Sequence, residues 1–248
     1  MDCVYTADPR VVPDARLIPV ISYDEILELA ALGAKVMQSR SVEVGKKFGI
    51  PIYVRSSLLH RSKGTLITKE TRSMEEALVR GVALDEGESK ITLFRIPDRP
   101  GVAARIFKIL AADNVNVDMI IQNKTETRTT DLSFTVRKSE LDSAMKSVTK
   151  AARAVQAGHA VCDQHMAKVS IVGVGMRSHS GIASKMFQAL AKKKINIEMI
   201  STSEIKISVI VQAQKGKEAL RAIHDAFGLG KSEKDPDLRY NLKRRITR

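Results

Sequence analysis

The chain has 248 residues, 44% of them hydrophobic, and a formal net charge of +13 at pH 7. This length accommodates two or three small domains, and no window approaches the roughly 18 apolar residues of a membrane span. No signal peptide is recognisable, and the two cysteines, Cys3 and Cys162, form neither a disulfide framework nor a metal-binding spacing. We therefore expect a cytoplasmic protein with no membrane partner and no metal site.

The positive charge admits two interpretations. A basic surface is typical of proteins that bind nucleic acid, but basic helices and the tail 243–248 (KRRITR) account for the charge equally well. The lysines are scattered, aromatic residues make up only 4% of the chain, and no stacking platform or helix-turn-helix signature is recognisable. We favour basic helices, and a nucleic-acid-binding module is the less favoured alternative.

Residues 1–57 predict a small α/β region. Ser22 and Glu25 have the spacing of a capping box, which indicates the start of a helix. A second helix is expected over residues 41–48, and the apolar run 50–55 favours a short strand. A polar, basic linker with one short strand at 65–68 follows. One strand and two helices do not complete a domain.

The most informative feature is a duplication of residues 91–136 as residues 169–211. Identical residues recur at one common offset: Gly101 and Gly181, Phe107 and Phe187, Leu110 and Leu190, Asn116 and Asn196, Met119 and Met199. Self-similarity in register indicates a repeated supersecondary unit.

Each copy predicts the order strand, helix, strand, strand, helix and then a final strand. The expected elements are residues 90–96, 101–113, 117–123, 131–137, 141–154 and 160–163 in the first copy, and 168–174, 181–194, 197–203, 206–212 and 217–227 in the second. This is a βαββαβ unit, with an antiparallel sheet covered on one face by two helices. The charged tail after Gly230 is expected to be loose.

Each copy places a glycine turn at a helix start and an Asn beside an acidic residue on the next strand. In the first copy Gly101 allows close backbone approach, and a helix N-terminus there favours an anion such as a carboxylate. Asn116 could bond a carboxylate or an amine, Asp118 could pair with an ammonium group, and Asn196 and Glu198 repeat this pair. The alternative is a capped turn with solvated polar residues. Because the turn and the polar pair recur in register in both copies, we favour a free amino acid as ligand.

Four further segments, together with the repeats, resemble one known family. They read YTADPR (5–10), GAKV (33–36), IPIYVRSS (50–57) and ISTSEI (200–205). The repeats resemble ACT domains, which are regulatory amino-acid-binding modules, and the whole arrangement resembles the C-terminal part of aspartate kinase. The resemblance implies an α+β fold of tandem ferredoxin-like ACT domains, preceded by the last part of an α/β amino-acid kinase domain. The expected boundaries are 1–72 for the kinase remnant and linker, 73–163 and 164–230 for the ACT domains, and 231–248 for the basic tail.

The resemblance also implies a remnant nucleotide site for ATP and Mg²⁺. Tyr5 would pack near adenine, Arg10 would reach phosphate, and Lys35 would bind the nucleotide or neutralise charge during phosphoryl transfer. The implied set is Tyr5, Thr6, Ala7, Asp8, Pro9, Arg10 and Lys35. The family's KFGG-type phosphate loop and aspartate-binding residues have no counterpart here. We therefore expect no complete catalytic site, no certain cofactor for this chain, and a mainly regulatory polypeptide.

In aspartate kinases the implied effectors are lysine, threonine or both. The expected effector site comprises Asp98, Gly101, Val102, Asn116, Val117, Asp118 and Gln122 in the first copy, and Gly181, Ile182, Asn196, Ile197, Glu198 and Thr202 in the second. Ser180 stands where the family usually has proline, which would weaken or alter the second site. The implied partners are a second copy bound through the ACT domains or a full-length catalytic subunit. A kinase that is active by itself is the main alternative.

Overall fold

The computed structural model describes residues 3–32, 37–57, 64–71, 74, 77–124 and 128–230. The N-terminal region contains β1 (Val20–Ser22), α1 (Tyr23–Ala31), α2 (Ser39–Phe48), β2 (Ile52–Val54) and β3 (Thr65–Thr68). Its strands form a three-stranded sheet in the order β1-β3-β2, with β1 and β3 parallel. The capping box is confirmed, because the Ser22 hydroxyl accepts from the Glu25 amide while the Glu25 carboxylate accepts from the Ser22 amide. The predicted strand at 65–68 is confirmed as β3.

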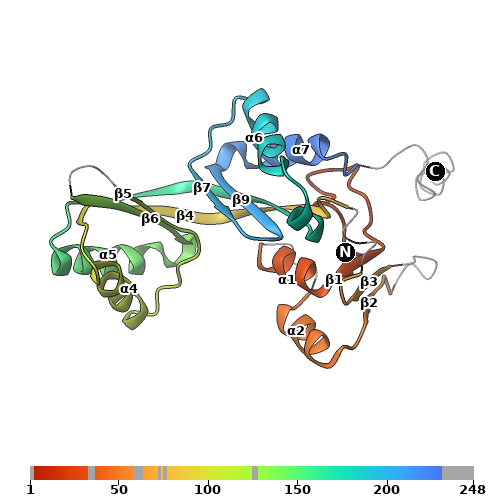
Figure 1. Ribbon diagram of the computed structural model, residues 1–248, viewed down its shortest axis with the longest axis horizontal. Helices are drawn as coiled ribbons and strands as arrows, with labels where there is room; N and C mark the ends of the chain where they lie inside the picture. Colours follow the sequence, from red (N-terminus) through yellow and green to blue (C-terminus); the bar gives the residue numbers. More distant parts are fainter. Residues whose placement is uncertain are drawn as a thin grey trace.

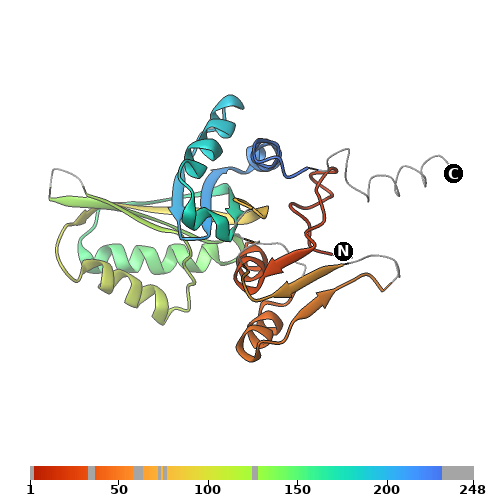
Figure 2. The ribbon, with the colours of Figure 1, turned by 45° about the vertical axis from the view of Figure 1, so that its right-hand side comes forward.

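The duplicated region builds one six-stranded sheet in the order β5-β6-β4-β7-β9-β8, antiparallel throughout (Figure 1). Helices α4 and α5 cover one face of the sheet at one end, and α6 and α7 lie on the opposite side at the other end (Figures 1 and 2). The elements are β4 (Gly81–Pro97), α4 (Val102–Ala112), β5 (Ile120–Lys124), β6 (Thr129–Arg137), η1 (Lys138–Glu140), α5 (Leu141–Val155), β7 (Ala160–Val172), η2 (Val174–Ser178), α6 (Ile182–Lys192), β8 (Met199–Thr202), β9 (Lys206–Gln212), η3 (Ala213–Lys215) and α7 (Gly216–Ala226). The predicted helices and the strands β5, β6, β8 and β9 follow the expected order, but the strands expected at 160–163 and 168–174 are one continuous strand, β7, and among the described residues no strand follows α7.

Two long strands, β4 and β7, run through both repeats, and each contributes one of its ends to the sheet of the other repeat. Residues 160–163 of β7 pair with residues 90–93 of β4 and complete the sheet of the first repeat. Residues 81–85 of β4 pair with residues 168–172 of β7, so they provide the second repeat with its remaining strand. Val79 and Val82, grouped with the first repeat by sequence, therefore lie in the core of the second.

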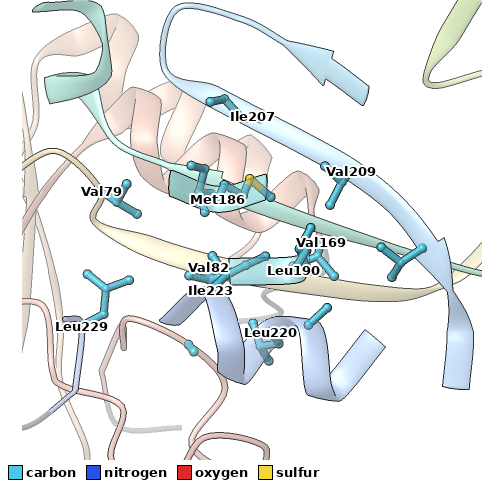
Figure 3. Packing of buried hydrophobic residues seen from close by; sticks show 14 of the residues in the cluster. Val79, Val82, Val169, Met186, Leu190, Ile207, Val209, Leu220, Ile223 and Leu229 are labelled. Carbon is cyan, nitrogen blue, oxygen red and sulfur yellow. The ribbon is translucent and has the colours of Figure 1, made fainter. Parts of the chain in front are cut away.

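The core of the second repeat extends beyond the repeat itself. Val169, Val209, Leu220 and Ile223 meet there between the sheet and α7 (Figure 3). The same cluster contains the N-terminal residues Ala7, Val12 and Ala15. The core of the first repeat, in contrast, consists of residues from the range 91–155.

Two of the features expected from the sequence fall outside the part of the chain that the structure describes. The GAKV segment with Lys35 and the basic tail 231–248 both lie outside the described residues. None of the helices described is long and apolar enough to cross a membrane.

Candidate functional site

The two glycine turns have the same backbone geometry. Gly101 (φ 88°) and Gly181 (φ 86°) are the N-caps of α4 and α6, and both are left-handed. A Cβ at either position would meet nothing within 4 Å. The left-handed conformation, rather than crowding, therefore requires glycine at these turns, and the duplication predicted from sequence extends to the backbone angles.

A cavity of about 360 Å³ lies beside the first glycine turn. It is enclosed by the turn, the first residues of α4 and the strands β5 and β6; its lining residues are Ile96, Pro97, Asp98, Arg99, Pro100, Gly101, Val102, Ala103, Ile106, Gln122, Thr130 and Leu132. The first amides of a helix have no partner within the helix, and they favour an anion at this end. The size is in the usual range of small-molecule sites, roughly 300–1,000 Å³. Asp98, Gly101, Val102 and Gln122 of the predicted set are thus brought together.

Asn116, Val117 and Asp118 are not among the residues that line this cavity. Asn116 is exposed, and Val117 packs against the core of the first repeat. The Asp118 carboxylate contacts the Lys168 ammonium, which comes from the opening strand of the second repeat. An effector ammonium would therefore compete with a lysine side chain at Asp118.

The acidic residues of the two repeats form reciprocal ion pairs across the repeat boundary. Lys90 of the first repeat binds Glu198 of the second, with Nζ 2.9 Å from Oε2. Lys168 of the second repeat binds Asp118 of the first, and its Nζ lies 2.8 Å from Oε1 of the buried Glu88. Burial alone would lower the pKa of Lys168, but the hydrogen bonds that its ammonium donates to Asp118 and Glu88 outweigh this effect and raise the pKa.

The second repeat arranges its predicted residues differently. Ile182 is buried in the core, and Ile197 packs against that core. Asn196 donates from Nδ2 to Oε1 of Glu198 at 3.4 Å, so the structure brings this pair together. Gly181 begins α6, and Thr202 is exposed at the end of β8.

The implied nucleotide segment packs against the second repeat. Tyr5 and Ala7 contact its core, and the Thr6 hydroxyl is buried. Asp8 and Arg10 form an ion pair of 2.7 Å in which the Arg10 side chain is 81% exposed. The hydrogen bond from Arg10 lowers the pKa of Asp8. Pro9 is half-buried at the turn between them.

Sequence reasoning missed part of the cavity wall. Thr130 and Leu132 lie on β6, and Leu132 is paired with Gln122 of β5. The signal was available, because alternate residues of a strand share one face and Thr130, Leu132 and Phe134 are all buried. Arg99 and Ala103, which flank the predicted glycine turn, were also missed.

Comparison with known proteins agrees with this architecture. The ACT domain model matches residues 95–152 and 169–227, and the amino acid kinase family model matches residues 1–56. An aspartate kinase from Pseudomonas putida is 49% identical over 230 residues, which are 92% of this chain and 56% of that protein. The crystal structure of the regulatory subunit of aspartate kinase from Thermus thermophilus is 44% identical, with a TM-score of 0.58, over 60% of this chain and 99% of that one. The structure of Escherichia coli aspartokinase III with lysine and aspartate is 26% identical, with a TM-score of 0.73, over 92% of this chain and 50% of that one.

The chain is thus a tandem ACT-domain protein with part of an amino-acid kinase domain at its N-terminal end. It belongs to the aspartate kinase family, and it corresponds to the regulatory part of such enzymes together with the segment that precedes it. The chain spans about 56% of the length of the Pseudomonas putida relative.

Proposed function

We propose that this chain is the amino-acid-sensing part of an aspartate kinase and that its effector binds in the cavity beside Gly101. The observation that carries the proposal is a cavity of about 360 Å³ that adjoins the N-terminus of α4. An effector carboxylate would approach the first amides of this helix, while Asp98 and Gln122 lie on the cavity wall. Lysine or threonine is the proposed effector, and the presence of lysine in the aspartokinase III structure supports this choice. Binding would change kinase activity through a coupling free energy of about 1–3 kcal/mol.

In the complete enzyme the reaction would be transfer of a phosphoryl group from ATP to the side chain of L-aspartate, which gives 4-phospho-aspartate. Such catalysis depends on positioning and on cations that stabilise charge. Arg10 is exposed and fits a phosphate-contacting role, and Lys35 is the other proposed cation. Thr6 fits less well, because its hydroxyl already bonds three groups within the protein. ATP with Mg²⁺ would supply the phosphoryl group.

Association with a second chain is part of the proposal. Ile120 on β5 and Ile200 on β8 are 49% and 41% exposed, and these strands are the two edges of the six-stranded sheet. Exposed apolar residues on edge strands favour pairing with another chain. We propose either a homodimer through the ACT domains or a complex with a full-length catalytic subunit. Sedimentation of the purified chain, alone and with a catalytic subunit, distinguishes the two.

Calorimetric titration with lysine, with threonine, and with each in the presence of the other tests effector binding. Gln122 and Thr202 occupy equivalent positions on β5 and β8, so Gln122→Ala and Thr202→Ala are matched variants. We expect Gln122→Ala to weaken binding more than Thr202→Ala does, because Gln122 lines the cavity. Equal affinity in both variants would place the effector elsewhere. No heat from either amino acid, with a folded and dimeric chain, would contradict an effector-binding function of this polypeptide.

The match of residues 1–56 to the amino acid kinase family favours one second function, which is kinase activity of this chain by itself. An ATP-dependent hydroxamate assay with saturating aspartate tests it. We expect no turnover, because the sequence has no phosphate loop. Measurable turnover would establish the chain as an enzyme in its own right.

A further inference from the structure

Three side chains converge where the N-terminal segment meets the last helix of the second repeat. Asp14, His224 and Asp225 each offer one ligand atom, and these atoms all lie within 4.8 Å of one another. Asp14 is held there by a backbone bridge between Ala15 and Gly230. His224 and Asp225 belong to the last turn of α7. The cluster therefore joins two segments that are more than 200 residues apart in sequence.

The hydrogen bonds of Thr6 determine which nitrogen of His224 carries the proton. The Thr6 hydroxyl donates its one hydrogen to the Leu229 carbonyl at 3.1 Å and accepts from the Arg16 amide at 2.9 Å. Nε2 of His224 lies 3.0 Å from the same oxygen. Because the hydroxyl has no second hydrogen to give, Nε2 must be the donor. Nδ1 therefore presents a lone pair.

This lone pair is buried and lies near the carboxylate of Asp225. His224 is 0% exposed, and among the residues described its Nδ1 is a buried atom without a hydrogen-bond partner. Oδ1 of Asp225 lies 4.0 Å from it. A buried acceptor without a partner costs about 1–3 kcal/mol, and a cation bound there would also offset the charge of the two aspartates in the cluster.

We propose that Asp14, His224 and Asp225 bind a divalent transition metal ion such as Zn²⁺, with water completing the coordination shell. One imidazole nitrogen and two carboxylate oxygens form a donor set suited to such ions. Both aspartates are exposed, and the Asp225 side chain is 72% accessible, so the carboxylates can rotate toward Nδ1. The Thr6 hydroxyl accepts from the other ring nitrogen, in the place where a metal-bound histidine commonly donates to a carboxylate, a backbone carbonyl or water. A bound ion would fasten residue 14 to α7.

Equilibrium dialysis of the full chain with Zn²⁺ at neutral pH tests the site, and the thermal unfolding midpoint provides a second readout. Asp14→Asn, Asp225→Asn and His224→Gln remove one ligand each. The glutamine nitrogen can still bond Thr6, so His224→Gln deletes Nδ1 while keeping the buried contact. Asp142→Asn, which alters an exposed carboxylate on α5, is the matched control.

We expect saturable binding of one Zn²⁺ that raises the unfolding midpoint in the wild type and in Asp142→Asn, and loss of both effects in the three ligand variants. The Nδ1 resonance of ¹⁵N-labelled His224 should shift on metal addition. The absorption spectrum with Co²⁺ should lack a thiolate charge-transfer band, which excludes Cys3 and Cys162 as ligands. No saturable binding, unchanged binding in the ligand variants, or a thiolate band would overturn the proposal.

Discussion

The two repeats share their backbone geometry but differ in what surrounds it. Gly101 and Gly181 have φ angles of 88° and 86°, yet only the first turn adjoins the cavity described above. At the second turn the next residue, Ile182, points into the core. The core of the first repeat draws on residues 91–155, whereas the core of the second also includes residues 7–15 and 79–82. The two copies therefore share the turn, while a cavity adjoins it in the first copy and the core of the second copy also packs against the N-terminal region.

The attachment of the second repeat consists of polar as well as apolar contacts. Glu25, buried in the capping box of α1, also accepts from the Val174 amide at 3.0 Å. Thr6 of the implied nucleotide segment contacts His224 of α7. A change in the second repeat would therefore reach the N-terminal region directly, whereas a ligand in the first repeat would act through β4 and β7. The reciprocal ion pairs lie on this route.

The largest expected effect is a difference in stability between variants that break the two ion pairs. Lys168→Ala would leave the buried Glu88 carboxylate without its cation, because both side chains are less than 5% exposed. We expect a loss of about 3–5 kcal/mol in the free energy of unfolding. Lys90→Ala breaks the more accessible pair with Glu198 and should cost about 1 kcal/mol or less. Urea denaturation of both variants measures the difference, and similar losses would show that the two pairs are equivalent.

A second comparison concerns two buried hydroxyls. Thr6 lies in the N-terminal segment that packs against the second repeat, and Ser147 lies in the first repeat. Thr6→Val removes a group that bonds Arg16, His224 and Leu229, and it leaves buried polar groups unpaired. We expect a loss of about 1–3 kcal/mol. Ser147→Ala removes a single bond to the partly exposed Asp113, which water can replace, so the loss should be smaller. If thermal and chemical denaturation give the reverse order, the N-terminal segment is not an integral part of the second repeat.

Much of this comparison was predictable from sequence, and the exceptions have a physical cause. Helical periodicity and the repeated glycine indicated the elements, and β9 occupies the predicted residues 206–212. The local sequence pattern could not show that residues 81–85 of β4 pair with β7, because strand pairing depends on long-range packing. The same limit applies to Asp118: its sequence position suggested a ligand contact, but the fold brings its carboxylate into contact with the Lys168 ammonium. Strand alternation indicated that Thr130 and Leu132 share one face, but that this face lines the cavity became clear only from the pairing with β5.

The glycine turns allow the ligand role to be separated from the backbone role. Gly101→Ala and Gly181→Ala should each cost about 1–2 kcal/mol, because alanine is strained at a positive φ and neither site is crowded. Gly101→Ala should also weaken effector binding, since residue 101 lines the cavity. Calorimetry on the two folded variants measures this second effect. Equal affinities would mean that the cavity is not the effector site, and unequal stabilities would mean that the turns are not equivalent.

The smallest expected effect is a pH dependence that belongs to the second repeat. Because burial lowers the pKa of His224 below its ordinary value of 6.5, the unfolded chain binds this proton at a higher pH than the folded chain does. The neutral imidazole makes its full contribution to the free energy of unfolding above pH 6.5. This contribution decreases as the pH falls from 6.5 to the folded-state pKa, by at most about 1.4 kcal/mol per pH unit. Urea denaturation at pH values on either side of 6.5, with a chelator present, measures the free energy of unfolding. This free energy should change less with pH in His224→Gln than in the wild type.

Hydrogen exchange should detect the acid-induced loss of protection in α7 before α5. Simultaneous loss in both helices would argue that the repeats unfold as one unit.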